Sequence, residues 1–206
     1  MRRTILFAIA ATFMAAAVVS AQEHPGAGRF DITIAPVGGM FFTDPAQPGQ
    51  TDFSNYALTG SVSFNFHPHF ALEGEFGNAI GVHQTISIGD TVFLDQRSPS
   101  MYVYNSNLIF HPAGSDRRLA PYVVGGIGGM TMLGGDSTRR LGLTDTTTYL
   151  TGNAGGGLKW FGGRRWGIRG DYRLFAVRDK STAPEFFARD TVRYGHRVYG
   201  GLILNY

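Results

Sequence analysis

The chain ends with the sequence RYGHRVYGGLILNY, residues 193–206. Successive side chains of a β-strand point to opposite faces, so this stretch as a strand would have two different faces. One face is largely apolar and ends in an aromatic residue: His196, Val198, Gly200, Leu202, Leu204 and Tyr206. The other mixes small, polar and charged residues: Gly195, Arg197, Tyr199, Gly201, Ile203 and Asn205. One face for hydrocarbon and one for a polar lumen is the pattern of a transmembrane β-barrel strand.

The chain begins with MRRTILFAIAATFMAAAVVSAQ, which has the composition of a secretory signal peptide. Two arginines precede an apolar run, and Val19 and Ala21 supply the small residues that a signal peptidase requires. The run is short for a membrane helix of about 20 residues, which is the alternative interpretation. We therefore predict a signal peptide over residues 1–21, a short polar leader over 22–29 and the barrel domain over 30–206.

Composition excludes several function classes. The chain has no cysteine, which excludes disulfides, thiol catalysis and cysteine-ligated metals. Two of its 18 basic residues are Arg2 and Arg3, so the predicted mature part has 18 − 2 = 16 basic residues against 15 acidic ones. This near-neutral balance gives no reason to expect a nucleic-acid partner. A mean hydropathy of −0.05 excludes a bundle of membrane helices but suits a barrel, in which alternation averages the signal away.

Between the ends, alternation of apolar and polar residues and the turn residues predict a series of strands. With the last stretch, eight are expected: residues 30–42, 55–66, 70–79, 100–110, 120–133, 147–160, 166–177 and 193–206. A long connection over 80–97 carries a further stretch with strand character. The segment 120–133 is so rich in glycine that alternation does not indicate which of its faces points inward.

The connections alternate in length. Long ones follow the first, third, fifth and seventh strands, and short ones follow the second, fourth and sixth. Outer-membrane barrels have this asymmetry, with short periplasmic turns and longer outer loops. The predicted fold class is therefore all-β: an eight-stranded antiparallel transmembrane β-barrel.

The signal peptide, the loop asymmetry and the aromatic last strand together resemble the small eight-stranded outer-membrane barrels of the OmpA, OmpX and OmpW type, over roughly residues 30–206. Leu202, Leu204 and Tyr206 resemble the C-terminal signature that directs such barrels to their insertion machinery. The resemblance implies a monomer in the outer membrane of a Gram-negative-type bacterium. It also implies contact with outer-membrane lipids and lipopolysaccharide, and with periplasmic chaperones and the barrel-assembly machinery during biogenesis.

Charged residues on the predicted inward faces form the first candidate site: Asp31, Glu73, Glu75, Lys159, Arg169, Asp171, Arg173 and Arg197. An eight-stranded barrel is only wide enough for side chains to fill it, so these charges have to pair. Glu73 and Glu75 are expected to meet the inward arginines. The pairs would either plug the lumen or gate a narrow ion path, or they would simply fill the interior, which is the interpretation we favour.

Four bases in the long connections, Arg139, Arg140, Arg178 and Lys180, are candidates for contact with lipopolysaccharide phosphates. The simpler alternative is solvated loop charge.

Catalytic and metal sites are weakly indicated. Some small outer-membrane barrels modify lipid A with a histidine and a serine, and His196 has a suitable position, but no serine accompanies it in a recognisable motif. His67 and His69 lack a third metal ligand. The glycine clusters near residues 125–129 and 155–157 do not have the spacing of a nucleotide-binding loop. We therefore expect no catalytic residue, no metal and no cofactor.

The function that these observations favour is a non-enzymatic surface protein with a structural or interaction role, in membrane integrity or in contact with lipopolysaccharide or a host. A narrow channel for ions or small solutes and a lipid A-modifying hydrolase centred on His196 are the alternatives. A soluble lipocalin-like barrel would need its apolar faces inside.

Overall fold

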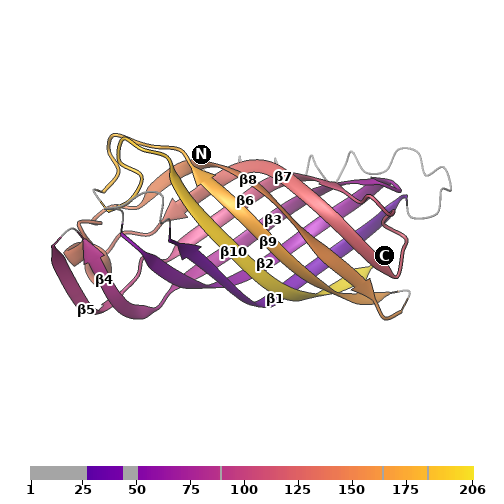
Figure 1. Ribbon diagram of the computed structural model, residues 1–206, viewed down its shortest axis with the longest axis horizontal. Coiled ribbons are helices and arrows are strands. Elements are labelled where there is room, and N and C mark those ends of the chain that lie inside the picture. The colour runs from indigo at the N-terminus through magenta and orange to yellow at the C-terminus, as the bar shows by residue number, and fades with distance from the viewer. Residues whose placement is uncertain (1–26, 44–50, 89, 164, 185) are drawn as a thin grey trace, which may run out of the picture.

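The computed structural model describes residues 27–43, 51–88, 90–163, 165–184 and 186–206 (Figure 1). The predicted signal peptide and most of the leader lie outside these residues. Among the described residues, no helix is both long and apolar enough to cross a membrane.

Eight strands form one closed antiparallel barrel, as predicted, in the order β1-β10-β9-β8-β7-β6-β3-β2. Their bounds are β1 Arg29–Phe42, β2 Phe53–His67, β3 Phe70–Gly81, β6 Met101–Phe110, β7 Leu119–Met132, β8 Thr147–Phe161, β9 Trp166–Val177 and β10 Arg193–Asn205. The stretch with strand character in the long connection 80–97 forms a separate hairpin of β4 His83–Ile88 and β5 Thr91–Arg97.

The first and last strands close the barrel. Ile34 of β1 pairs with Leu202 of β10, and backbone hydrogen bonds join Phe30 and Tyr206 beyond the end of β10. The β1 register shifts around Pro36 on both sides, which is where a residue without a backbone N–H interrupts a ladder. The apolar last strand thus has a hydrogen-bonded neighbour along each edge.

The two faces of the wall are opposite in character. Along β9, Ile168, Tyr172 and Leu174 are exposed on the outside, whereas Arg169 and Arg173 are buried inside. Exposed large apolar residues cover the outside of the other barrel strands as well. A soluble barrel would reverse this arrangement, so the lipocalin-like alternative is wrong.

The structure also orients β7, which the sequence left open. Its even-numbered residues face inward, including Ala120, Tyr122 and Val124, and Val123 and Ile127 face outward. The glycines that follow have no side chains to reveal this alternation.

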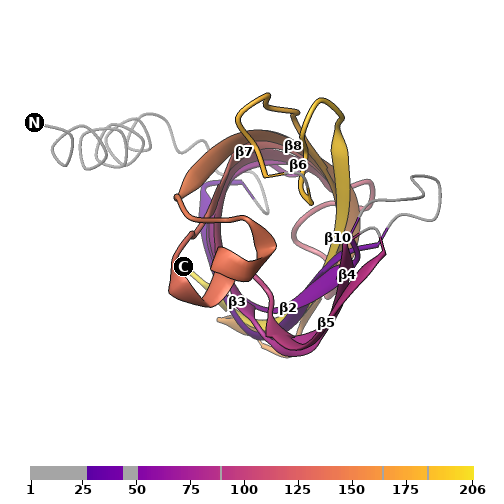
Figure 2. The ribbon, with the colours of Figure 1, turned by 90° about the vertical axis from the view of Figure 1, so that its left-hand side faces the viewer.

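Short and long connections lie at opposite ends of the barrel. The short turns lie at one end together with the C-terminus, which we call the turn end (Figure 1). The hairpin β4–β5 and the long connections lie at the other, the loop end. A short 3₁₀ helix, η2 Asp136–Leu141, stands in the connection between β7 and β8. Figure 2 shows it over one side of the barrel mouth.

Candidate functional site in the barrel lumen

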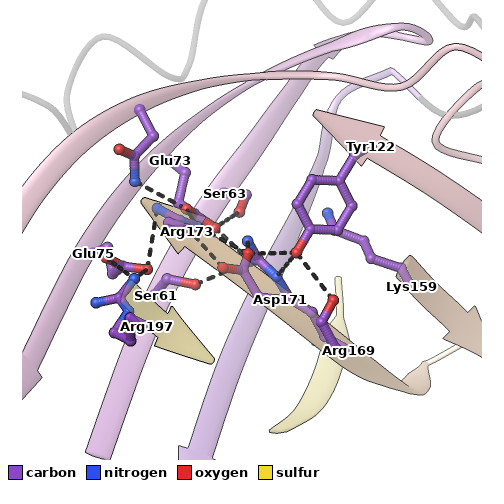
Figure 3. A network of polar contacts seen from close by, with 12 residues as sticks. Ser61, Ser63, Glu73, Glu75, Tyr122, Lys159, Arg169, Asp171, Arg173 and Arg197 are labelled. Carbon is purple, nitrogen blue, oxygen red and sulfur yellow. Dashed lines mark hydrogen bonds and ion pairs between the residues drawn. The ribbon is translucent and has the colours of Figure 1, made fainter. Parts of the chain in front are cut away.

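The eight charged residues predicted to face inward all lie inside the barrel, and none is more than 5% exposed. We call this set the charged layer: Asp31, Glu73, Glu75, Lys159, Arg169, Asp171, Arg173 and Arg197. Figure 3 shows most of it. In the ring of strands β3 and β9 stand opposite each other, four places apart in either direction. The glutamates of β3 therefore face the arginines of β9 across the lumen.

Glu73 lies at the centre of the charged layer. Its carboxylate accepts hydrogen bonds from Arg169 Nη1 and, at 2.7 Å, from Arg173 Nη2. Asn107 Nδ2 donates to it at 3.0 Å and Ser63 Oγ at 3.2 Å. A carboxylate with four donors around it is compensated for the loss of water, and this makes a fully buried charge tolerable.

Glu75 binds Arg197 and shares Arg173 with Glu73. Arg197 and Arg173 are direct neighbours across the β9–β10 ladder and would repel each other without an anion between them. Glu75 accepts from Arg197 Nη2 at 2.7 Å through both carboxylate oxygens and lies 3.3 Å from Arg173 Nη1. The carboxylate from β3 thus neutralises two cations of the opposite wall.

Asp171 of β9 pairs with the two arginines of its own strand. It accepts from Arg169 Nη2 at 2.8 Å and from Arg173 Nε at 2.9 Å. The Tyr122 hydroxyl of β7 donates to it at 2.5 Å and accepts from Arg169 Nε at 2.7 Å. Ion pairs and hydrogen bonds therefore run from wall to wall.

Nearer the turn end, Lys159 Nζ donates to Asp31 at 2.7 Å. The layer then contains four carboxylates and four cations. His111, in the turn after β6, is also buried. Burial, with the positive charge of Lys159 close by, lowers the pKa of the His111 imidazole to about 3, so the ring adds no charge at neutral pH. The charges of the layer balance.

Above the charged layer, at the loop end, the lumen becomes largely apolar, although the buried guanidinium of Arg193 in β10 also lies there and donates to the backbone carbonyls of Phe42 and Thr51. The strands contribute Met40, Phe42, Phe53, Met101, Val103, Met130, Met132, Tyr149, Phe175 and Val177, all buried. The loops and the hairpin add Ile86, Leu141, Leu143, Phe186 and Phe187, also buried. We call these loop and hairpin residues the mouth stopper.

Phe187 of the mouth stopper packs against aromatic rings of three barrel strands, β1, β2 and β8. Its ring lies 5.1 Å from that of Phe42 and 5.3 Å from that of Tyr149, both edge to face, and 6.0 Å from that of Phe53. The sequence predicts only a long outer connection over residues 178–192, without this packing. The adjacent pair Phe186 and Phe187, in an otherwise polar loop, was the available signal.

The four loop bases do not form one cluster. Arg139 makes an exposed ion pair with Asp136 at 2.8 Å, and Arg140 lines a pocket at the loop end. Arg178 is exposed just after β9, and Lys180 Nζ lies 3.5 Å from the Thr148 carbonyl.

His196 lies on the outer face of β10, and its Nδ1 is 2.7 Å from the Tyr172 hydroxyl of β9. Among the described residues, no serine side chain hydrogen-bonds to it. At the turn end, His69 Nδ1 is 2.7 Å from the His111 carbonyl. Within the described part of the chain, no three potential metal ligands of the His, Cys, Asp and Glu types gather in one place. Leu202, Leu204 and Tyr206 are exposed on the outer face of the closing strand.

Comparisons with known proteins agree with the eight-stranded barrel of the structure. The sequence profile of the "outer membrane protein beta-barrel domain" family matches residues 4–195. No curated protein matches the sequence. Among solved structures, Neisserial surface protein A is similar with a TM-score of 0.56 and 9% identity, covering 86% of this chain and 97% of its own.

Two further solved structures have the same architecture. The N-terminal barrel domain of Pseudomonas aeruginosa OprF is similar with a TM-score of 0.53 and 13% identity, over 88% of this chain and 99% of that one. Ail, the attachment invasion locus protein of Yersinia pestis, was solved in complex with the heparin analogue sucrose octasulfate. It is similar with a TM-score of 0.50 and 12% identity, and the match covers 86% of this chain and 98% of Ail. At these identities the likeness concerns the fold.

Proposed function

The chain belongs to the outer membrane protein beta-barrel domain family, and from this we propose that it acts as a closed, non-catalytic surface protein of the outer membrane. Its loop end would face outward and contact lipopolysaccharide or molecules outside the cell. The observation that carries the proposal is the closure of the lumen at two successive levels, first by the charged layer and then by the apolar mouth.

The two closures oppose conduction for different reasons. In the charged layer, a passing ion would have to compete with ion pairs that already balance each other and reach from β3 to β9. At the mouth it would meet mainly aromatic and aliphatic side chains, which offer it no ligand. The surface at the loop end is then the part of the protein that is available to partners outside the membrane.

The loop bases support an anionic partner. Arg178 and Lys180 are exposed near the outer ends of β8 and β9, where phosphates of neighbouring lipopolysaccharide would lie next to a barrel of this family. Ail, which has the same fold, binds a polysulfated sugar analogue in its solved complex. We propose that Arg139, Arg140, Arg178 and Lys180 provide the positive charge for such contacts.

Two measurements test this function. Purified protein in planar bilayers should give no conductance steps, and steady single-channel steps would contradict a closed barrel and favour the channel alternative. In nanodiscs, lipopolysaccharide binding should weaken about tenfold in an Arg178→Ala/Lys180→Ala variant. The matched control is Arg117→Ala/Arg165→Ala, which removes two bases at the turn end. Equal weakening in both double variants would show that total charge matters rather than the loop surface.

A further inference from the structure

Methionine is concentrated at one level of the barrel. The chain has six methionines, and two of them lie in the predicted signal peptide. The other four are all fully buried in the apolar mouth: Met40, Met101, Met130 and Met132. Closure of the lumen does not require sulfur, because any apolar side chain of this size would fill the same space. The functions discussed above leave this concentration of thioethers unused.

Three of these methionines are neighbours on two paired strands. Met101 of β6 is the direct ladder partner of Met132 of β7, and Met130 lies two residues before Met132 on the same inward face. In an antiparallel pair, Cβ atoms of directly opposite residues are about 4.5–5.5 Å apart and those of diagonal neighbours about 7–8 Å. The thioether ends a flexible side chain with three rotatable bonds. The three sulfur atoms can therefore converge on one point of the lumen, and we call these residues the methionine triad.

The surroundings of the methionine triad also suit a cation. Tyr149 of β8 is the ladder partner of Met130, and its buried hydroxyl has no hydrogen-bond partner in the described part of the chain. An unused oxygen thus stands on the strand next to the triad. The buried cation of the mouth, Arg193, belongs to β10, which lies opposite β6 in the ring, and it donates to the carbonyls of Phe42 and Thr51. Its charge is thereby held on the far side of the mouth.

From this arrangement we infer that the methionine triad binds Cu(I). Thioethers are soft ligands that select Cu(I), whereas Mg²⁺, Ca²⁺ and Mn²⁺ prefer carboxylate, carbonyl and water oxygens. The chain has no cysteine, so within it no thiolate competes for such an ion. This inference goes beyond the proposed surface contact and does not depend on it.

The ion would enter from the outer side and stay there. The mouth stopper, which packs in the same cluster as the triad, comes from the loops and the hairpin. Because these segments lie outside the ladders of the closed barrel, they can leave while the wall remains intact. Beneath the apolar mouth, the ion pairs of the charged layer fill the lumen from wall to wall. The triad would therefore retain Cu(I) at the outer mouth rather than pass it through the barrel.

The test uses the whole protein in lipid nanodiscs and Cu(I) supplied without oxygen as its coloured bicinchoninate complex. Loss of the colour measures transfer to the protein, and empty nanodiscs of the same composition give the background. We expect transfer of one Cu(I) per chain, with sulfur neighbours in X-ray absorption at the copper edge. Transfer no greater than to empty nanodiscs would overturn the inference. Nitrogen neighbours without sulfur would also overturn it, because they would assign the ion to histidines such as His67 and His69.

Methionine-to-leucine variants locate the site, since leucine has nearly the same volume but no sulfur. Met132→Leu should weaken Cu(I) binding by at least about tenfold, because losing a ligand costs no less than losing a residue that supports one. Met101→Leu/Met132→Leu should abolish binding. The matched control is Met40→Leu, at an equally buried methionine of β1, which lies opposite β7 in the ring, and it should leave binding unchanged. A heat-dependent gel shift verifies that all three variants are folded. Equal weakening by Met40→Leu and Met132→Leu would contradict the triad as the site.

Discussion

The middle of the lumen and its outer mouth are both filled, but with opposite chemistry and by different parts of the chain. In the middle, every member of the charged layer is a residue of a barrel strand. At the mouth, strand residues such as Phe42 meet Leu141 from η2 and Phe187 from the last connection.

This difference has consequences for stability. The ladders of the closed barrel set the position of a strand residue, so the charged layer can come apart only if the barrel does. A loop can leave the mouth while every ladder hydrogen bond remains, and such segments have the lowest local stability in a fold. We therefore expect changes in the charged layer to affect the whole barrel and changes in the mouth stopper to affect its loops.

The largest effect is expected for Glu73→Gln. The substitution keeps the shape of the side chain but removes one of the carboxylates that Arg169 and Arg173 share, so the buried layer is left with one positive charge in excess. The free energy of unfolding should fall by about 3–5 kcal/mol, the usual result of breaking a buried ion pair on one side. Urea unfolding in micelles, followed by tryptophan fluorescence, measures it.

The matched control for this substitution is Asp95→Asn, at a side chain that is 86% exposed in the hairpin. Its effect should stay within about 0.5 kcal/mol. If Glu73→Gln cost no more than this control, the charged layer would not be a structural unit of the barrel.

A smaller and more local effect is expected for Phe187→Ala. Removing this ring should weaken the docking of the last connection by about 3 kcal/mol, because the ring packs on three other aromatic rings at the mouth. Amide hydrogen exchange at residues 186–188 should then accelerate about a hundredfold, with little change in the urea midpoint of the barrel. Leu94→Ala, at an exposed hairpin position, is the control. An equally large fall in the barrel's own stability would remove the distinction between the two regions.

The smallest change in stability is expected for substitutions at two inward-facing glycines, Gly195 and Gly77. A Cβ at Gly195 would lie 2.6 Å from the Phe42 ring at the mouth, whereas at Gly77, beside the charged layer, its nearest neighbours would be 3.4–3.5 Å away. Gly195→Ala should therefore cost about 1–2 kcal/mol through displaced packing, and Gly77→Ala less than about 0.5 kcal/mol. Urea midpoints of the two variants measure the difference. The opposite order would mean that the charged layer is packed more tightly than the mouth.

Much of the wall could be predicted from the sequence, because strand geometry is local. A period of two assigns Arg169 and Arg173 to one face and Tyr172 to the other without knowledge of any neighbour. Turn residues divide the chain into segments in the same local way, and the lengths of the connections follow from the division. The all-β class, the eight barrel strands, their inward charges and the two kinds of connection were accessible for this reason.

The tertiary structure decided everything that depends on which residues meet. The ring order places β3 opposite β9, and that order is what brings Glu73 across the lumen to Arg169 and Arg173. Which face of β7 points inward was decided by its pairing with β6 and β8, because its glycines show no alternation of apolar and polar side chains. The mouth stopper and its pocket had no periodicity to reveal them, since Leu141 and Phe187 come from separate loops whose meeting depends on the closed barrel. Sequence alone therefore determined the two-faced wall through local geometry, and the closed ring determined what fills it.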